Sequence, residues 1–271
     1  MELPLVILDT ETATFDGPPH LLELGAIRVV DGEVTDQFLS LVCPEVPIQL
    51  EASQFHGITE EDVRGAPPLE EVLQRFTDWA DDDWLCAHSA PFDARVLGYE
   101  YARTRLTPPP GPFVDTLSLA KRYLPEAPDH KLATLAEYLD LDTGALHRAL
   151  EDAVAAWQVL VACCDRYEQI HSSPPTFATL LEQSGTHSTI EGAVPAQPRL
   201  NARTRALQAA CQDGTPVLMH YGMPPAPSMA HEIWPRLLFR SKQKSYLEAL
   251  CTRSGILKTY RLDRIQRVSP I

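Results

Sequence analysis

Short apolar runs separated by turn signals predict a sheet in the first part of the chain. Residues 5–8 (LVIL) form an apolar run that ends abruptly in acidic residues, as a buried strand does at the edge of a sheet. Residues 21–34 and 37–44 have strand-like patterns, and Asp31–Gly32 supplies a turn signal between apolar neighbours. Together these segments favour an antiparallel meander.

Helical spacing of apolar residues follows the predicted meander. Residues 67–82 place apolar side chains three and four positions apart, and residues 84–88 (WLCAH) have the pattern of a second buried strand. Helices and strands that alternate around one sheet make the fold class α/β. The other elements expected here are a helix from Pro91, a strand leading into a helix over 113–124, a helix over 131–141 and a helix from near Arg148 to about Tyr167.

The last part of the chain has a different pattern. Residues 171–201 are rich in Ser, Thr, Pro and Gly, show helical spacing only over 176–183, and are expected to form a linker. Residues 202–271 then open with a helical pattern. The β-like runs that follow it, which predict a small barrel or sheet, cover 216–221, 233–240, 245–251 and 256–265. We therefore expect a domain over 1–170, a linker and a second domain over 202–271.

Composition limits the class of protein. The chain has 271 residues, of which 44% are hydrophobic, and this suits two packed domains. It shows neither a signal-peptide pattern nor an apolar run of the roughly 18 residues that a membrane span needs, so we expect a cytoplasmic protein without a membrane partner. The six cysteines form no CxxC pair, which favours reduced thiols over a zinc site or an obligatory disulfide.

The net charge of −14 is divided unevenly along the chain. From residue 190 onward there are 12 Lys and Arg against 5 Asp and Glu, about +7, which leaves 11 against 32, about −21, for residues 1–189. Such a shift marks a domain boundary and makes the basic part the candidate for an anionic ligand.

Four carboxylates are candidates for metal chemistry. Asp9 and Glu11 lie two positions apart at the end of a predicted strand, so the pleat directs both side chains to one side. Asp93 follows a predicted buried strand at the beginning of a helix, and Asp152 lies near the beginning of the last helix of this part. Hard carboxylate ligands of this kind suit Mg²⁺ or Mn²⁺.

His147 and Asp152 raise a geometric question. At about 100° per residue, five positions would place them roughly 140° apart on one helix. If His147 instead lies on the loop before the helix, where Gly144 supplies a break, both side chains can point into one cleft. The alternative is that the acidic residues only complement the positive end of the helix and that His147 is an ordinary surface residue.

Three segments with these residues resemble the motifs of the DEDDh exonuclease superfamily, which includes the proofreading subunit of the bacterial replicative polymerase. The motifs are 8–12 (LDTET), 87–93 (AHSAPFD) and 147–153 (HRALEDA), in the order of the family. The resemblance covers about residues 4–168. Further matches lie at 21–27, 55–63 and 114–120.

The resemblance implies a ribonuclease-H-like mixed sheet flanked by helices and a hydrolytic site for nucleic-acid 3′ ends. By position, Asp9, Glu11, Asp93 and Asp152 would hold two divalent ions, Mg²⁺ or Mn²⁺. His147 would be the general base that takes a proton from the attacking water, which answers the geometric question above.

Neighbouring residues receive roles from the same resemblance. Thr10 and Thr12 would contact the terminal nucleotide, and His56 would fix a loop near the substrate cleft. His88 opens the second motif, where a supporting or structural role is favoured over a ligand role. Phe92 is expected in the core.

Two positions depart from the usual motifs of the family. Ala13 stands where many relatives have Gly, and Ser89 stands where Asn is frequent. Neither position is an expected metal ligand, so these departures predict altered substrate handling in an active enzyme.

Residues 232–268, preceded by 217–222, resemble a WYL domain, a small Sm-like β-barrel. Ser245-Tyr246-Leu247 stands at the name-giving Trp-Tyr-Leu, so the Trp is absent. The resemblance implies a basic pocket for nucleic acid or a nucleotide-like ligand, although a solvated charged face and a core tyrosine would give the same pattern. The corresponding positions are Tyr221, Arg236, Tyr246, Arg261 and Arg264.

The sequence therefore predicts a metal-dependent 3′→5′ exonuclease that acts on single-stranded DNA, with a basic module that binds nucleic acid or a regulatory nucleotide. One alternative is a ligand-sensing regulatory protein in which the nuclease fold is a platform. Another is an exoribonuclease, because discrimination between RNA and DNA depends on contacts to the 2′-hydroxyl. The oligomeric state has no signal in the sequence.

Overall fold

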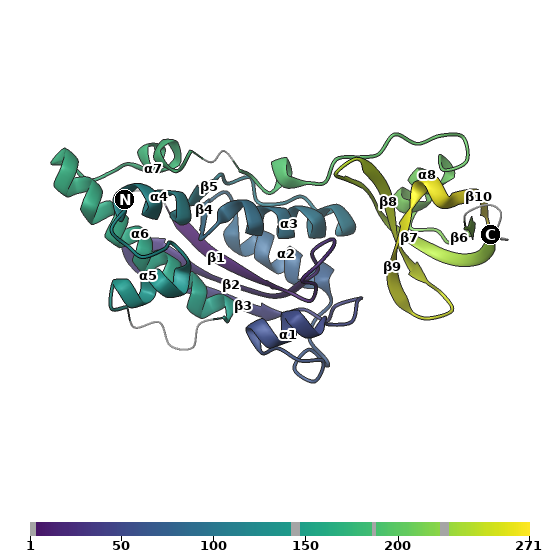
Figure 1. Cartoon of the computed structure of the whole chain (residues 1–271), viewed down its shortest axis with the longest axis horizontal. Coiled ribbons are helices and arrows are strands. Elements are labelled where there is room, and N and C mark those ends of the chain that lie inside the picture. The colour runs from purple at the N-terminus through teal and green to yellow at the C-terminus, as the bar shows by residue number, and fades with distance from the viewer. Residues whose placement is uncertain (1–3, 142–146, 186–187, 223–227) are drawn as a thin grey trace. The chain divides into compact units, whose positions relative to one another are not determined.

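The structure is a computed structural model that describes residues 4–141, 147–185, 188–222 and 228–271. The chain divides into two compact units, residues 1–194 and 195–271 (Figure 1). Within the described ranges, no helix combines the length and the apolar character that crossing a bilayer requires.

The first unit is a mixed five-stranded sheet with helices on both faces. Its strand order is β3-β2-β1-β4-β5, in which β1 pairs antiparallel with β2 and parallel with β4. This confirms the expected α/β class with a mixed sheet flanked by helices. The elements of this unit are β1 (Leu5–Thr12), β2 (Leu21–Val30), β3 (Glu33–Leu41), α1 (Leu50–His56), α2 (Leu69–Ala80), β4 (Trp84–Ala87), α3 (Ala90–Thr104), β5 (Phe113–Asp115), α4 (Thr116–Tyr123), α5 (Leu132–Tyr138), α6 (Ala149–His171), α7 (Phe177–Ser184) and η1 (Glu191–Ala193).

Alternate side chains of β1 pack into two separate cores, one on each face of the sheet. Leu5 and Ile7 pack in a core with α4, α6 and α7, whereas Val6 and Leu8 pack in a core with α2 and α3. All four side chains are fully buried, because both faces of this central strand are covered by helices. The strand continues to Thr12, so the acidic residues of its second half belong to the sheet itself.

Helix α6 lies directly against the backbone of β2. A Cβ atom placed on Gly25 would lie 2.2 Å from the backbone nitrogen of Leu150 and 2.3 Å from the carbonyl carbon of Ala149. Only glycine permits this approach. The contact fixes the first turn of α6 over the middle of β2.

The first unit extends beyond residue 170, where the sequence predicted its end. Phe177 and Leu180 of α7 lie in the same core as α6, and Ile190 lies in the core with α2 and α3. The segment 171–201, expected as a linker, therefore belongs to the first unit as far as Val194. The helical spacing over 176–183 corresponds to α7 (Phe177–Ser184), which packs in the core of the first unit.

The second unit contains a five-stranded antiparallel sheet with the order β10-β6-β7-β8-β9. Its core includes Leu207 of the helix, Met219, Leu247 and Tyr260. β9 and β10 are the edges of this order within the described residues, so closure into an Sm-like barrel stays a prediction. The elements are α8 (Ala206–Asp213), β6 (Val217–Tyr221), β7 (Met229–Ser241), β8 (Lys244–Cys251), β9 (Ile256–Arg261), η2 (Leu262–Arg264) and β10 (Ile265–Pro270).

The contact between β2 and α6 predicts a large effect of one methyl group. We expect Gly25→Ala to destabilise the first unit by at least about 1–3 kcal/mol, the usual cost of overpacking, because the clash is with backbone atoms. The measurement is thermal unfolding by calorimetry, beside Gly192→Ala. At Gly192 the nearest atom is the Thr189 hydroxyl at 3.0 Å, so this control has room to adjust. Equal effects of the two substitutions would contradict the close docking of α6.

Candidate active site

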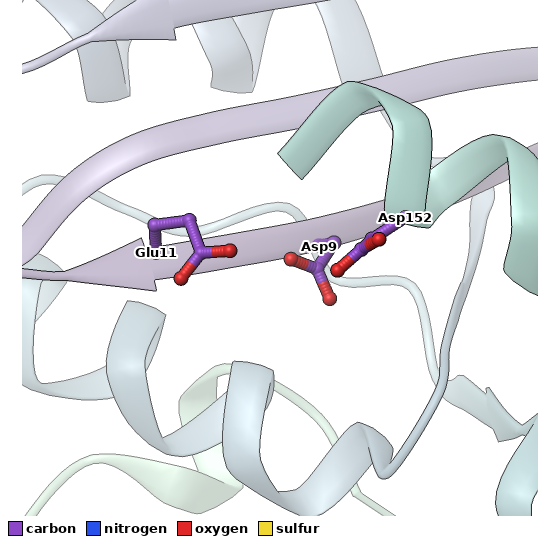
Figure 2. Close-up of side chains that lie close together, drawn as sticks. All are labelled: Asp9, Glu11 and Asp152. Atoms are coloured by element: carbon purple, nitrogen blue, oxygen red, sulfur yellow. The ribbon is translucent and has the colours of Figure 1, made fainter. Parts of the chain in front are cut away.

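Three carboxylates meet between β1 and the first turn of α6 (Figure 2). Asp9 and Glu11 alternate with Thr10 on β1 and therefore point to the same side, as their spacing predicts. Asp152 approaches from α6, and oxygen atoms of the three residues all lie within 4.8 Å of one another. Residues that are more than 140 positions apart in the sequence thus form one acidic cluster.

Asp93 lies beside this acidic cluster but is not among its three members. It is 1% exposed in the first turn of α3, and its Oδ1 accepts a hydrogen bond of 2.8 Å from the hydroxyl of Thr10. The negative charge of Asp93 nevertheless raises the pKa of Asp9, so the two carboxyl groups interact. The Thr10 hydroxyl, for which the sequence suggested contact with a nucleotide, is thus engaged in holding Asp93.

Burial and nearby negative charges raise the pKa of every carboxyl group in the acidic cluster. The pKa of Glu11 rises to about 8, first through burial and then through the negative charges of Asp152, Glu23 and Asp93. Burial is also the main cause of the raised pKa of Asp9 and of Asp152. The cluster therefore favours either protons or a cation that neutralises it.

His147 lies immediately before α6, as the geometric argument required. Its φ of 75° is unusual for a residue with a side chain, and its backbone N–H donates to Oδ1 of Asp152 at 3.2 Å. The imidazole ring packs 4.5 Å from the ring of Phe55. This backbone conformation brings the histidine and the carboxylate into one cleft, whereas Gly144, the predicted break, lies outside the described residues.

Glu23 holds the beginning of α6, although the sequence analysis did not single it out. Its side chain is 1% exposed on β2 and accepts hydrogen bonds from Nε of Arg148 at 3.0 and 3.2 Å and from the backbone N–H of Ala149 at 2.9 Å. The signal available in the sequence was one glutamate among the apolar residues of the first half of β2. A buried charge in such a setting needs partners, and here the partners begin the helix.

Two histidines near the cleft are held by the chain itself. His56 donates from Nε2 to the carbonyl of Thr12 at 3.2 Å and accepts at Nδ1 from the N–H of Ile58 at 3.0 Å. Burial lowers the pKa of His56, so the neutral ring that this pattern requires is favoured. His56 thus joins the end of β1 to the turn after α1, and its role beside a substrate stays a prediction.

His88 has both ring nitrogens engaged in the same way. Nε2 lies 2.9 Å from the carbonyl of His130, which can only accept, and Nδ1 lies 2.8 Å from the hydroxyl of Thr116. Burial lowers the pKa of His88, which favours the neutral ring with the proton on Nε2. The residue therefore supports the cleft wall, and neither nitrogen is available to bind a substrate.

The acidic cluster opens into a cleft with a volume of about 560 Å³. Phe15, Phe55 and Phe92 line this cleft and are 67%, 57% and 45% exposed. The prediction that Phe92 belongs to the core was wrong, because its helix turns that face toward the cleft. Thr12 also lines the cleft, with its hydroxyl donating to the carbonyl of Thr14 at 3.0 Å, and Lys131 adds a positive charge.

The donor set fits a hard divalent cation. Carboxylate oxygens are the ligands that Mg²⁺ and Mn²⁺ prefer, and three of them converge here. The raised pKa of Glu11 shows that the protein alone leaves the negative charge of the cluster under-compensated. A divalent cation would provide the missing positive charge.

A model of the exonuclease family matches residues 6–160, more than half of the chain. The chain belongs to the exonuclease family. A model of the WYL domain matches residues 203–270. The two matches confirm that both resemblances inferred from the sequence, nuclease and WYL, are correct.

Curated relatives of this exonuclease-family chain include much longer proteins. It is 34% identical over 160 residues to a PolC-type DNA polymerase III of Bacillus cereus and 36% identical over 159 residues to that of Oceanobacillus iheyensis. These alignments cover 58% and 57% of the chain but only 11% of each polymerase. The shared part is the nuclease region.

Solved structures give the same picture of the fold. An exonuclease X in complex with 5′-overhanging duplex DNA has a TM-score of 0.53 and 27% identity, with 67% of this chain and 99% of the other covered. The Escherichia coli exonuclease I in complex with a dA16 oligonucleotide has a TM-score of 0.55 and 15% identity, with 92% and 55% covered. The second likeness concerns the fold alone.

In the WYL unit, three of the predicted ligand residues lie together. Tyr246 on β8 is paired with Arg261 on β9, and the backbone N–H of Arg261 donates to the hydroxyl of Tyr221 at 3.3 Å. The guanidinium of Arg261 forms an ion pair with Asp263, so part of its charge is already compensated.

The other two predicted ligand residues lie at irregular points of the same unit. Arg236 lies at the irregularity of β7 between Pro235 and Leu237, and Arg264 ends η2. Nε of Arg264 is buried without a hydrogen-bond partner among the described residues. A guanidinium nitrogen in this state favours an anionic ligand that would satisfy it.

The raised pKa values of the acidic cluster predict that the metal-free protein loses stability as pH rises. The pKa of Glu11 is about 8 in the folded state against an ordinary value of 4.5, so the folded protein binds more protons than the unfolded chain between these pH values. We expect the melting temperature in chelator to fall from pH 5 to pH 8. Glu11→Gln should reduce this fall, whereas Glu70→Gln, at an exposed carboxylate of α2, should not.

A divalent cation should reverse this loss. Because protons compete with the cation for the same oxygens, Mg²⁺ or Mn²⁺ should raise the melting temperature more at pH 8 than at pH 5. At a concentration 100 times its dissociation constant, the cation should add about 2.7 kcal/mol. An equal rise in wild-type protein and in Glu11→Gln at both pH values would contradict the site.

Proposed function

We propose that this chain is a divalent-metal-dependent 3′→5′ exonuclease of the DEDDh type that acts on single-stranded DNA. The observation that carries the proposal is the placement of His147 next to the cluster of Asp9, Glu11 and Asp152, at the end of one cleft. A cluster of carboxylates with an adjacent imidazole suits phosphodiester hydrolysis, in which a water must be deprotonated and negative charge stabilised.

The residues of the cleft divide the proposed reaction between them. Asp9, Glu11 and Asp152, with Asp93 beside them, would hold two Mg²⁺ or Mn²⁺ ions, which when bound stabilise the attacking and leaving oxygens of the phosphodiester. His147 accepts the proton of the attacking water at its ring. The bond from its backbone to Asp152 keeps the ring beside the acidic cluster.

The aromatic side chains of the cleft favour a single-stranded end as the substrate. Phe15, Phe55 and Phe92 offer exposed rings on which unpaired bases can stack, and Lys131 offers a charge for a phosphate. The exonuclease X that is 27% identical was solved with a DNA that has an overhanging end, which supports DNA. The fold also occurs in a 3′-exonuclease bound to a histone mRNA stem-loop, so the fold alone does not exclude RNA.

The WYL unit is proposed to bind nucleic acid or a regulatory nucleotide. The region from residue 190 onward carries a net charge of about +7, in contrast to the acidic nuclease unit. Tyr221, Tyr246 and Arg261 combine aromatic rings with a guanidinium, and Arg264 has an unsatisfied donor. An Sm-like barrel would suit this role.

The decisive experiment is the degradation of a 5′-labelled single-stranded oligonucleotide, as DNA and as RNA, with Mg²⁺ or Mn²⁺. We expect a ladder that shortens from the 3′ end, that disappears in chelator and in Asp152→Asn, and that persists in Glu70→Gln. His147→Ala should lower the rate about 10²–10⁴-fold. Binding without cleavage of either strand would instead favour the ligand-sensing regulatory function.

The role of the WYL unit is tested separately from cleavage. In chelator, where turnover stops, the full-length variant Arg261→Gln/Arg264→Gln should bind a single-stranded oligonucleotide more weakly than wild type, by roughly tenfold for the loss of charged hydrogen bonds. Lys242→Gln, on an exposed residue between β7 and β8, is the control. Unchanged affinity of the double variant would exclude these arginines from nucleic-acid binding.

A further inference from the structure

A second groove of about 340 Å³ adjoins the catalytic cleft. It is lined by Leu41, His56, Gly57, Ile58, Asp62 and Arg148. His56 is common to the two, whereas the carboxylates of the acidic cluster line only the catalytic cleft. Any ligand group bound in this groove therefore lies beside the reacting phosphodiester and not on it.

Arg148 in this groove is fixed on one side and open on the other. Its Nε and one terminal nitrogen, Nη2, donate to the buried carboxylate of Glu23. Its Nη1 has no partner among the residues that the structure describes, and the side chain is 44% exposed. A guanidinium held in this way has already lost most of its rotamer freedom, so a further bond to an anion costs little ordering entropy.

Positive charge is scarce around the proposed substrate path. Lys131 in the catalytic cleft and Arg148 in the groove are the Lys and Arg residues that line the two hollows, within the described part of the chain. A nucleic-acid strand carries one phosphate per nucleotide, and each phosphate in an acidic domain needs a nearby cation or solvent. Arg148 provides such a cation in the groove that adjoins the catalytic cleft.

We propose that Arg148 binds a phosphate of the substrate strand other than the one that is cleaved, and that the groove around it is a subsite for the strand behind the 3′ end. The inference rests on the proposed exonuclease function. It assigns to Arg148 a binding role in addition to its contact with Glu23. Asp62, the carboxylate in the same groove, opposes this binding and sets its strength.

Two substrates separate a subsite from a purely structural role. A single-stranded oligonucleotide has phosphates behind the scissile one, whereas the 4-nitrophenyl ester of thymidine 5′-monophosphate has a single phosphodiester and none behind it. In the double variant Glu23→Gln/Arg148→Met, which leaves no unpaired buried charge, the loss of kcat/KM should be roughly 10- to 100-fold greater on the oligonucleotide than on the ester. Equal losses on both substrates would show that Arg148 only holds the fold.

The salt dependence gives an independent measure of the same contact. Each phosphate contact to a single strand adds about 0.7 to the slope of log K against log salt concentration, so the double variant should flatten this slope for the oligonucleotide by about 0.7. An unchanged slope would overturn the proposal.

A second variant tests the groove without disturbing α6. Asp62→Asn removes a negative charge beside Arg148 and keeps an oxygen for the bonds from Thr59. It should lower KM for the oligonucleotide roughly 1.5- to 5-fold more than KM for the ester. Glu61→Gln, the same charge change at an exposed neighbour outside the groove, is the matched control and should not do so.

The outcomes also distinguish this proposal from the proposed function. If the wild-type protein cleaves neither substrate, the exonuclease function fails and the subsite fails with it. If the wild-type protein cleaves both and the Asp62 and Glu61 variants behave alike, only the subsite is wrong.

Discussion

The direct contact between α6 and β2 sets the geometry on which the rest of the site depends. β2 pairs along its length with β1, which carries two of the clustered carboxylates, and α6 carries the third. At Gly25 the two backbones approach so closely that no side chain fits between them. Two residues earlier, Glu23 binds the first N–H of the helix. A displacement of α6 would therefore separate Asp152 from β1 before it disturbed either core.

This geometry has an electrostatic cost. Four carboxyl groups lie in or beside a partly buried cluster, and their raised pKa values record both desolvation and repulsion. The hydroxyl of Thr10 and the backbone N–H of His147 donate one hydrogen bond each to these carboxylates, which offsets only part of the cost of burying their charge. The folded chain tolerates the cluster because helices on both sides of β1 bury continuous apolar surface. In the proposed enzyme, the same under-compensated charge is what attracts the cations.

The parts of the site that follow from local periodicity could be predicted from the sequence. Residues two positions apart on a strand point to the same side of a sheet, and this spacing predicted that Asp9 and Glu11 lie together. The predicted beginning of the last helix placed Asp152 in its first turn and His147 on the loop before it. The contacts that depend on packing could not be predicted, because no local pattern specifies them. That Thr10 would hold Asp93, or that α7 would complete a core, is decided by elements distant in sequence. Phe92 was predicted to lie in the core because phenylalanine is usually buried, but its side chain is exposed in the cleft.

The uneven distribution of charge along the chain limits which part of it can attract a nucleic acid at long range. Residues 1–189 carry a net charge of about −21, so long-range attraction cannot bring a nucleic acid to this unit. In the proposed enzyme, affinity for this unit has to arise at short range, from stacking on exposed phenylalanines, from divalent cations bound by the carboxylates and from a guanidinium held in a fixed orientation. Such interactions depend little on the sequence of the strand, because every base has a stacking face and every nucleotide has a phosphate. Long-range attraction can come only from the region beyond residue 190, so in the proposed enzyme capture of the strand and its hydrolysis are assigned to different units of one chain.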